Sequence, residues 1–380
     1  MIPAGSSHRP CFPVWLSRRR WLEGAAALAA ASLAPQLAGA EPKASREVAR
    51  LSLNENPLGP SPKVVSAISR AMARLSRYTG QEAARLGQQI AAYEGVPAEQ
   101  VVLGEVLEPL GLQLGLEGGP GAEFVHSVPG YNALVDAARP VGGVSVGVPL
   151  DDAGSNDLGA LSAKITRRTR AVFLVNPHNP TGTVHDIATF RDFVRDVAKR
   201  TLVIVDEAYL EFMDDFGARS LRALVSANEN VIVFRTFGKA YGLAGLQLGY
   251  VLAPRALALR LSRAGVGAPR SLNLLAVVAA SAALGDQSFV SKVRTHVKAE
   301  RAAWNSLLSE LRLRQTHSHG NFVFFETGRP HADFAARMLA ERVAIGRAFP
   351  PLDTWARVSI GLPDENRRAR SAVKRVLAGS

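Results

Sequence analysis

Chemically reactive side chains follow three apolar runs of the sequence, each of which has the composition of a buried strand. The runs end in the segments 176–182 (NPHNPTG), 206–209 (DEAY) and 236–239 (TFGK). Ligands of an open parallel sheet bind beyond the carboxyl ends of its strands, so these segments predict one shared site. The site would combine an amide (Asn179), a carboxylate (Asp206), a phenol (Tyr209) and an amine (Lys239).

These four groups have complementary tasks around a pyridine aldehyde. Asp206 would keep the ring nitrogen protonated, because the cationic ring then withdraws electrons from a carbanion at the substrate's α-carbon. Asn179 and Tyr209 would hydrogen-bond the 3-oxygen of the ring. Lys239 would form a Schiff base with the aldehyde and then act as general base. Singly, Asp206 also fits a helix N-cap and Asn179 a turn, but their order with Lys239 favours pyridoxal 5′-phosphate (PLP) chemistry.

With these motifs the chain resembles the fold-type I PLP-dependent aminotransferases of class I/II, and within them it is most similar to histidinol-phosphate aminotransferase. The resemblance runs from about residue 51 to the C-terminus. The matching positions are 54–57 (NENP), 59–62 (GPSP), 179–182, 206–209, 235–237, Lys239, 242–246 (GLAGL), 321–322 and Arg357. The activity that this resemblance implies is transfer of an amino group between an amino acid, or related amine, and a keto acid.

The resemblance also implies further site residues. Tyr131 matches the aromatic residue that stacks on the ring, and Arg357 matches the arginine that binds the substrate's acidic group. Tyr78 matches a tyrosine that reaches the cofactor phosphate of a neighbouring subunit, which implies a homodimer. We also expect Thr236 and the helix opened by Gly104, Glu105 and Val106 to hold the cofactor, and Asn54 and Arg347 to contact the substrate.

Three positions depart from the family pattern. Gly238 stands where a serine usually precedes the lysine, Gln247 stands where an arginine is usual, and Glu105 adds a carboxylate. A charge-assisted hydrogen bond contributes roughly 1.5–3 kcal/mol, so PLP would bind about 10- to 100-fold more weakly if nothing compensates. The departures leave an alternative open, namely a PLP-dependent decarboxylase, lyase or racemase on this fold, or a catalytically drifted PLP-binding relative.

The elements that must position these residues indicate an α/β fold with a mainly parallel sheet. Strands are predicted at 124–127, 144–149, 171–176, 201–206 and 231–237, between helical segments that would cover both faces. Helices are expected at 64–75, 82–93, 272–284 and 289–313. Strands at 321–326, 343–347 and 357–360 and helices at 330–341 and 363–377 then suggest a small α+β end. The predicted parts are an arm and start of the small domain (41–75), a large PLP-binding domain (76–285) and the small domain (286–380).

Residues 1–40 have the three parts of a secretory signal peptide. The segment 17–22 (SRRRWL) precedes an alanine-rich stretch and ends in Ala38-Gly39-Ala40, and its paired arginines resemble the twin-arginine (Tat) type. We therefore expect export by the Tat machinery to the periplasm or beyond, with no stable membrane anchor. An N-terminal arm that stays on the protein is the alternative.

Composition narrows the remaining classes of function. The 380 residues carry a formal net charge of +12, but the basic residues follow helical patterns typical of solvated faces, so we expect no nucleic-acid partner. The single cysteine, Cys11, lies in the segment predicted to be removed, which excludes disulfides from the mature chain. His317 and His319 form an isolated pair without further ligands, and we expect no metal site.

Overall fold

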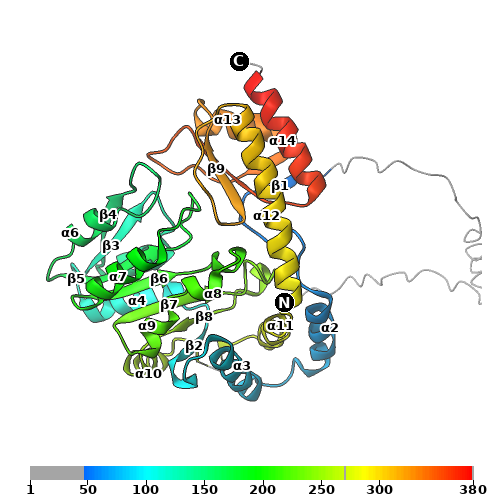
Figure 1. The fold of residues 1–380 in the computed structure, drawn as a ribbon. Helices are drawn as coiled ribbons and strands as arrows, with labels where there is room; N and C mark the ends of the chain where they lie inside the picture. Colours follow the sequence, from blue (N-terminus) through cyan, green and yellow to red (C-terminus); the bar gives the residue numbers. More distant parts are fainter. Residues whose placement is uncertain (1–46, 269–270, 379–380) are drawn as a thin grey trace, which may run out of the picture. The chain divides into compact units, whose positions relative to one another are not determined.

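A seven-stranded sheet carries the ends of all three motif-bearing runs (Figure 1). The computed structural model describes residues 47–268 and 271–378, so the predicted signal segment 1–40 lies outside the described residues. The strand order is β2-β8-β7-β6-β5-β3-β4, and β8 alone runs antiparallel to its neighbours. The strands are β2 (Val101–Gly104), β3 (Glu123–Val128), β4 (Val144–Pro149), β5 (Thr169–Val175), β6 (Leu202–Asp206), β7 (Val231–Thr236) and β8 (Gly249–Leu252).

Helices cover both faces of this sheet because its central strands are apolar on both sides. In β6, Leu202 and Ile204 face one core cluster, and Val203 and Val205 face the other. The first cluster includes residues of α4 (Leu107–Gly118), α5 (Ala133–Ala138) and α10 (Arg255–Arg263). The second includes residues of α6 (Leu158–Ala163), α7 (Ile187–Ala198) and α9 (Arg222–Ser226).

A group of helices follows the N-terminal arm. α2 (Pro62–Ala71) begins with Ser61 as N-cap, whose hydroxyl accepts from the backbone N–H of Val64, and with a proline in its first turn. The short helix η1 (Met72–Arg74) continues it, and α3 (Gly80–Glu94) ends at Gly95, whose φ of 68° suits glycine. Both α2 and α3 pack on α11 (Leu274–Leu284).

The C-terminal region contains two small sheets. β9 (Phe322–Glu326) and β11 (Trp355–Ser359) pair antiparallel, whereas β10 (Val343–Ile345) pairs in parallel with β1 (Ala49–Leu51) of the arm. The helices α12 (Gln287–Glu310), α13 (His331–Ala340) and α14 (Pro363–Ala378) complete the region (Figure 1). The arm therefore starts in the C-terminal region, and its residues 52–54 continue from there into the cavity described below. The three predicted domain boundaries stay predictions.

Each of the five strands predicted for the large sheet is present within two residues of its expected bounds. β2 and β8 were not predicted, because strands of four residues give too short a pattern. The helix expected at 104–106 is present and begins slightly later: Gly104 ends β2, Val106 is the N-cap, and α4 begins at Leu107. Arg347 was expected in a strand but follows the end of β10, and Arg357 lies at the centre of β11.

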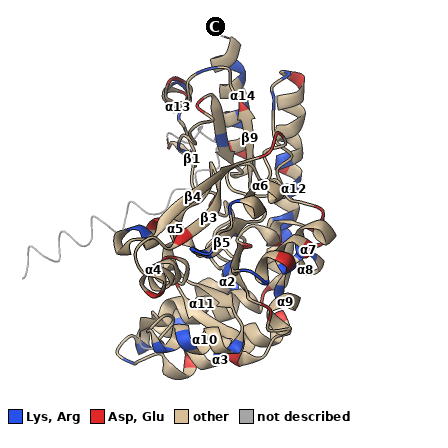
Figure 2. Cartoon of the chain, turned by 90° about the vertical axis from the view of Figure 1, so that its left-hand side faces the viewer, with Lys and Arg blue, Asp and Glu red and all other residues tan. Residues whose placement is uncertain are grey.

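Charged residues are distributed over many elements of the described chain. Figure 2 shows Lys and Arg on several helices, with Asp and Glu among them. No single helix within 47–268 and 271–378 is both long and apolar enough to cross a membrane, although α11 and α12, bent by 79° at their break, meet those criteria as a pair. The same residues contain no cluster of three or more His, Cys, Asp or Glu suited to a metal ion.

Candidate active site

One cavity of about 480 Å³ opens where the three motif-bearing strands end. Asp206 is the last residue of β6, Thr236 is the last of β7, and Asn179 follows β5. The arm and the loop after β10 close the cavity from other parts of the chain. The predicted site residues that line it are Asn54, Glu105, Tyr131, Asn179, Asp206, Tyr209, Thr236, Lys239, Arg347 and Arg357.

Asp206 presents a buried carboxylate to this cavity. The residue is 3% exposed, and its Oδ1 accepts a hydrogen bond from the backbone N–H of Ala208 at 2.9 Å. Burial raises the pKa of Asp206 to about 7, while that hydrogen bond and the nearby charge of Lys239 act in the opposite direction. The carboxylate is therefore placed to gain from a cationic hydrogen-bond donor in the cavity.

Lys239 lies in the turn that follows β7, three residues after the end of the strand. Its Nζ donates to the backbone carbonyl oxygen of Leu53 at 3.2 Å and lies 5.8 Å from the centroid of the Tyr209 ring. Among the described residues, Lys239 forms no ion pair within 4 Å. A primary amine held by one carbonyl is available to a ligand in the same cavity.

Tyr209 is held by two amide groups. Its hydroxyl oxygen accepts from Nδ2 of Asn54 at 3.1 Å and from Nδ2 of Asn179 at 3.3 Å. Asn54 has a left-handed φ of 55°, which asparagine tolerates better than most residues, and its Oδ1 accepts from the Ser359 hydroxyl at 2.9 Å. Its carbonyl accepts from Nδ2 of Asn321 at 2.9 Å. These contacts connect the phenol to both the arm and the C-terminal strands.

Arg357 brings a buried guanidinium to the cavity. It is 6% exposed, and it donates from Nη1 to Oδ1 of Asn179 at 2.6 Å and from Nη2 to the carbonyl oxygen of Ser52 at 2.8 Å. Its Nε has no hydrogen-bond partner among the described residues, and burial lowers its pKa. A buried cation whose hydrogen-bond partners are neutral suits an anionic ligand group.

Arg347 is exposed at the rim of the cavity. Its guanidinium stacks on the ring of Phe349 at 4.3 Å, and Nη2 donates to the carbonyl oxygen of Gly130 at 3.4 Å. The same ring lies 4.9 Å from the guanidinium carbon of Arg357. Phe349 was missed by sequence reasoning, because a phenylalanine next to prolines in a loop carries no motif of its own.

Several residues singled out in the sequence do not line the cavity. Tyr78 is 89% exposed on the segment between η1 and α3, and the side chain of Val106 is buried in the core. Two histidines in or near the motif-bearing strands, His126 and His178, are buried and do not line the cavity either, and burial lowers the pKa of His178 to about 3. Their contacts are local, with Ser145 and Thr181 respectively.

One part of the cavity wall carries more acidic than basic side chains. Its residues from 105–108 and 236–249 include Glu105, Glu108, Gly238 and Gln247, with Lys239 as the sole base of these two segments. Gln247 is exposed and adopts a left-handed φ of 47°. A second cavity shares Glu105 and Gln247 with the first. The wall therefore has carboxylates where an anion of a ligand would favour positive charge.

The polar side chains of the cavity fit the pyridine ring and the aldehyde of PLP. Asp206 matches a protonated ring nitrogen, Lys239 matches an aldehyde, and the amides around Tyr209 match a phenolic oxygen. The wall that carries Glu105, Glu108 and Gln247 fits a phosphate less well. These residues would hold the cofactor mainly through its ring and its covalent bond.

Comparison with known proteins agrees with this geometry. Residues 46–373 match the family model for aminotransferase class I and II. Histidinol-phosphate aminotransferase of Akkermansia muciniphila is 38% identical over 338 residues, which cover 87% of this chain and 90% of that protein. The enzyme of the same name from Anaeromyxobacter sp. is 39% identical over 339 residues, covering 87% and 91%.

A solved structure shares the fold and holds the cofactor. Histidinol-phosphate aminotransferase from Sinorhizobium meliloti, in complex with pyridoxal-5′-phosphate, matches with a TM-score of 0.80 at 28% identity and covers 90% of this chain and 96% of its own. The mainly parallel sheet with its flanking helices is thus the fold-type I architecture. The chain belongs to the class I and II aminotransferases, and it is a PLP-dependent transaminase.

Proposed function

We propose that this transaminase works with Lys239 as its catalytic base and Asp206 as the partner of the ring nitrogen. The observation that carries the proposal is the shared cavity, which places the amine of Lys239 and the buried carboxylate of Asp206 with Tyr209 and Asn179. When bound, PLP supplies a conjugated ring that accepts the electrons of the substrate's α-carbon. Lys239 Nζ takes the α-proton and returns it.

Arg357 and Arg347, which line the same cavity, orient the substrate. We assign the substrate's acidic group to Arg357, which lines the cavity and donates to the neutral oxygens of Asn179 and Ser52. Arg347 is exposed at the rim and reaches larger or second anionic groups. The substrate class is accordingly an amine with a carboxylate or phosphate, which includes α-amino acids and amino-alcohol phosphates.

Exposure to an amino donor alone tests the activity. We expect the absorbance band of the lysine-bound cofactor to be replaced by that of pyridoxamine phosphate, because transamination leaves the amino group on the cofactor. Histidinol phosphate and a panel of amino acids should be compared at equal concentration. Release of carbon dioxide or of an elimination product, with the original band retained, would instead favour the decarboxylase or lyase alternative.

Substitution of Gln247 by arginine is expected to tighten PLP binding. A guanidinium at this wall adds a charge-assisted hydrogen bond, so the dissociation constant should fall by about 10- to 100-fold. The backbone at 247 already holds a side chain in the left-handed region, so the change adds little strain. Equilibrium dialysis followed by absorbance measures the effect.

Gln113→Arg is the matched control for this substitution. It adds the same charge beside the second cavity without lining the first, and it should change the constant by less than about threefold. Equal affinity of wild type and Gln247→Arg would show that other groups already satisfy the phosphate.

A homodimer is proposed for the assembled enzyme. Tyr78 is exposed and lies outside the cavity of its own chain, as expected for a residue that serves a neighbour. Leu112 and Leu116 are exposed apolar residues beside the second cavity, which a second copy would cover. Light scattering of the purified protein should give twice the mass of the chain, and a monomer with full activity would contradict shared sites.

Export by the twin-arginine route is proposed from residues 17–40. The basic run, the short apolar stretch and Ala38-Gly39-Ala40 support it. Mass spectrometry of periplasmic material should identify a mature chain that begins at Glu41. Replacing Arg18 and Arg19 with lysine should leave the protein in the cytoplasm, and an unprocessed wild-type chain there would refute export.

A further inference from the structure

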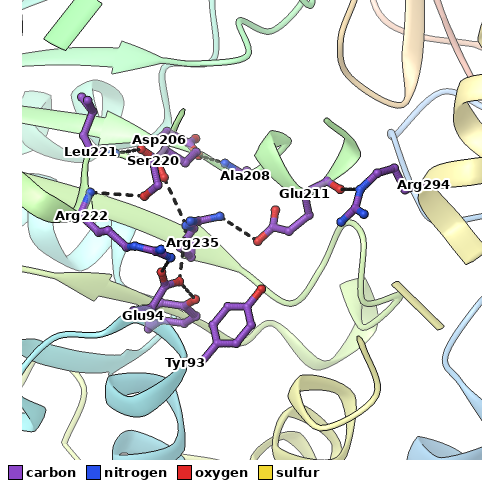
Figure 3. A network of polar contacts seen from close by, with 12 residues as sticks. Tyr93, Glu94, Asp206, Ala208, Glu211, Ser220, Leu221, Arg222, Arg235 and Arg294 are labelled. Atoms are coloured by element: carbon purple, nitrogen blue, oxygen red, sulfur yellow. Dashed lines mark hydrogen bonds and ion pairs between the residues drawn. The ribbon is translucent and has the colours of Figure 1, made fainter. Parts of the chain in front are cut away.

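Four buried charges meet at β7, in the strand that leads to Lys239. Arg235 is 1% exposed; its Nη1 lies 3.0 Å from Oε1 of Glu211, and its Nε lies 3.3 Å from Oε2 of Glu207 and 3.7 Å from Oε1 of Glu94. Figure 3 shows Arg235 between Glu94 and Glu211. None of these four side chains lines the cavity. They are therefore separate from the groups that touch a ligand.

Further polar groups surround this cluster on every packed element. Glu94 accepts from Nη1 of Arg222 at 3.3 Å and from the Tyr250 hydroxyl at 2.5 Å. Glu207 accepts from the backbone N–H of Leu221 at 2.8 Å. The groups that face Glu211 are Arg235, Glu94, Glu207, Tyr93 and Tyr241, and Arg294 of α12 donates to its backbone carbonyl at 2.7 Å.

When Arg222, the ion-pair partner of Glu94, is counted with it, the cluster has one more acid than base. Glu94, Glu207 and Glu211 face Arg235 and Arg222, and the three carboxylates are at most 2% exposed. An uncompensated charge is costly at such burial, so the cluster favours uptake of one proton. Burial raises the pKa of Glu211 to about 7, against the effect of Arg235. Glu207 has more neutral donors, from Leu221 and Ser220, which favour its ionised form.

The cluster joins two segments that carry cavity residues. Glu207 directly follows Asp206, and Glu211 lies two residues after Tyr209 on the short helix η4 (Leu210–Phe212). Arg235 immediately precedes Thr236 on β7. Arg235 Nη1 donates a hydrogen bond to Glu211, and its Nε forms an ion pair with Glu207. Because a guanidinium is planar and rigid, these two contacts restrict how the two segments lie relative to each other.

We propose that Arg235 is a positioning residue for amino transfer, which clamps segment 206–212 to β7, and that Glu211 carries the extra proton of the cluster. The inference rests on the proposed roles of Lys239 and Asp206. The clamp acts through these two residues and not by contact with substrate. Loss of the clamp changes the positions of Asp206 and Lys239 relative to the bound cofactor. Binding of the substrate's acidic group by Arg357 is preserved.

Substitution of Arg235 by lysine in the full chain with PLP tests the clamp. Lysine keeps the positive charge but lacks the planar group with several N–H donors. We therefore expect kcat to fall by up to about 100-fold, while KM for the donor changes less than about twofold. The pH midpoint of the absorbance change of the bound cofactor should move as well. Arg370→Lys is the matched control, because Arg370 pairs with Glu300 at 2.7 Å away from the cavity, and it should alter neither quantity.

Wild-type kcat and midpoint in folded Arg235→Lys would overturn the positioning role. If that variant does not fold, Glu207→Gln replaces it, since glutamine retains an oxygen acceptor for Leu221 and loses the charge that faces Arg235. A shifted midpoint in Glu207→Gln supports the clamp, and an unshifted one contradicts it.

Infrared spectra of the full chain test the proton. The carbonyl stretch of protonated carboxyl groups should be present in wild type at pH 5 and disappear as the pH rises through about 7. The part of this band that belongs to Glu211 should be missing from the spectrum of Glu211→Gln. A spectrum in which Glu211→Gln removes no such band would overturn the assignment. This measurement does not depend on PLP, whereas failure of borohydride to attach cofactor to Lys239 in wild type would refute the proposed function alone.

Discussion

Replacing Lys239 with alanine is expected to abolish covalent attachment of PLP and to lower turnover by about 10⁴-fold or more. The substitution removes both the amine that forms the imine and the base that moves the α-proton, and proton transfer alone contributes up to roughly 10⁴-fold. Borohydride reduction followed by peptide mass spectrometry measures attachment. Donor-dependent formation of the keto product measures turnover.

Lys164→Ala is the control for this loss, because Lys164 is exposed and does not line the cavity. It should retain a reduced adduct and wild-type turnover. An increase in the turnover of Lys239→Ala on addition of methylamine would agree with loss of the lysine amine as the cause. Full turnover of Lys239→Ala without added methylamine would remove the lysine from the mechanism.

Replacing Asp206 with asparagine is expected to lower kcat by roughly 10²- to 10⁴-fold while the protein becomes more stable. Asparagine retains an oxygen for the backbone N–H of Ala208 but no longer holds the ring nitrogen in its protonated form. The electron demand of the cofactor falls as a result. Steady-state kinetics with saturating PLP separates this effect from weaker cofactor binding.

The gain in stability follows from the pKa of Asp206, which burial raises from 3.8 to about 7 in the cofactor-free chain. A raised native-state pKa stabilises the wild type at low pH, and that contribution is lost as the pH rises from about 4 through about 7. Above pH 7 the buried carboxylate is ionised, so Asp206→Asn should be more stable by up to about 4 kcal/mol. Urea unfolding of cofactor-free protein at pH 5 and pH 8 measures the difference.

At pH 5 the advantage of Asp206→Asn should be small, because the native carboxyl is then protonated. Asp152→Asn, at an exposed position outside the cavity, should show no such pH-dependent gain. An Asp206→Asn protein that is less stable than wild type at pH 8 would show that the carboxylate is paired more strongly than its burial suggests.

The strands and their terminal residues could be predicted from the sequence because their signals are local. A continuous apolar run such as 202–205 (LVIV) indicates a strand that is buried on both faces. Because Asp206 is the first charged residue after this run, the sequence also predicts that the strand ends there. The same holds for β5 and β7, which place Asn179 and Lys239. β8 has no comparable signal, since its four residues gain their partners from β2 and β7.

Contacts between distant segments could not be predicted in this way. Asn54 reaches the Tyr209 hydroxyl across 155 residues, and Arg357 reaches Asn179 across 178 residues. Arg235 was part of a recognised motif, yet its three carboxylates come from different elements, and one of them lies on α3. The periodicity of a sequence predicts helices and strands, but it does not predict which turn of a helix packs against which residue of a strand.

The order of residue types along the chain by itself determined that an amine, a carboxylate, an amide and a phenol would follow buried parallel strands, and hence the cofactor chemistry. Runs of consecutive apolar residues are sufficient to predict the buried strands, and the residues that follow each run can then be read directly from the sequence. Only the tertiary structure decided that the arm and β11 complete the cavity and that Glu211 and Arg235 meet outside it. It also decided that Arg357 is buried there with no carboxylate partner among residues 47–268 and 271–378. These features depend on packing over long sequence separations, where small differences in register decide which polar groups meet and are desolvated together.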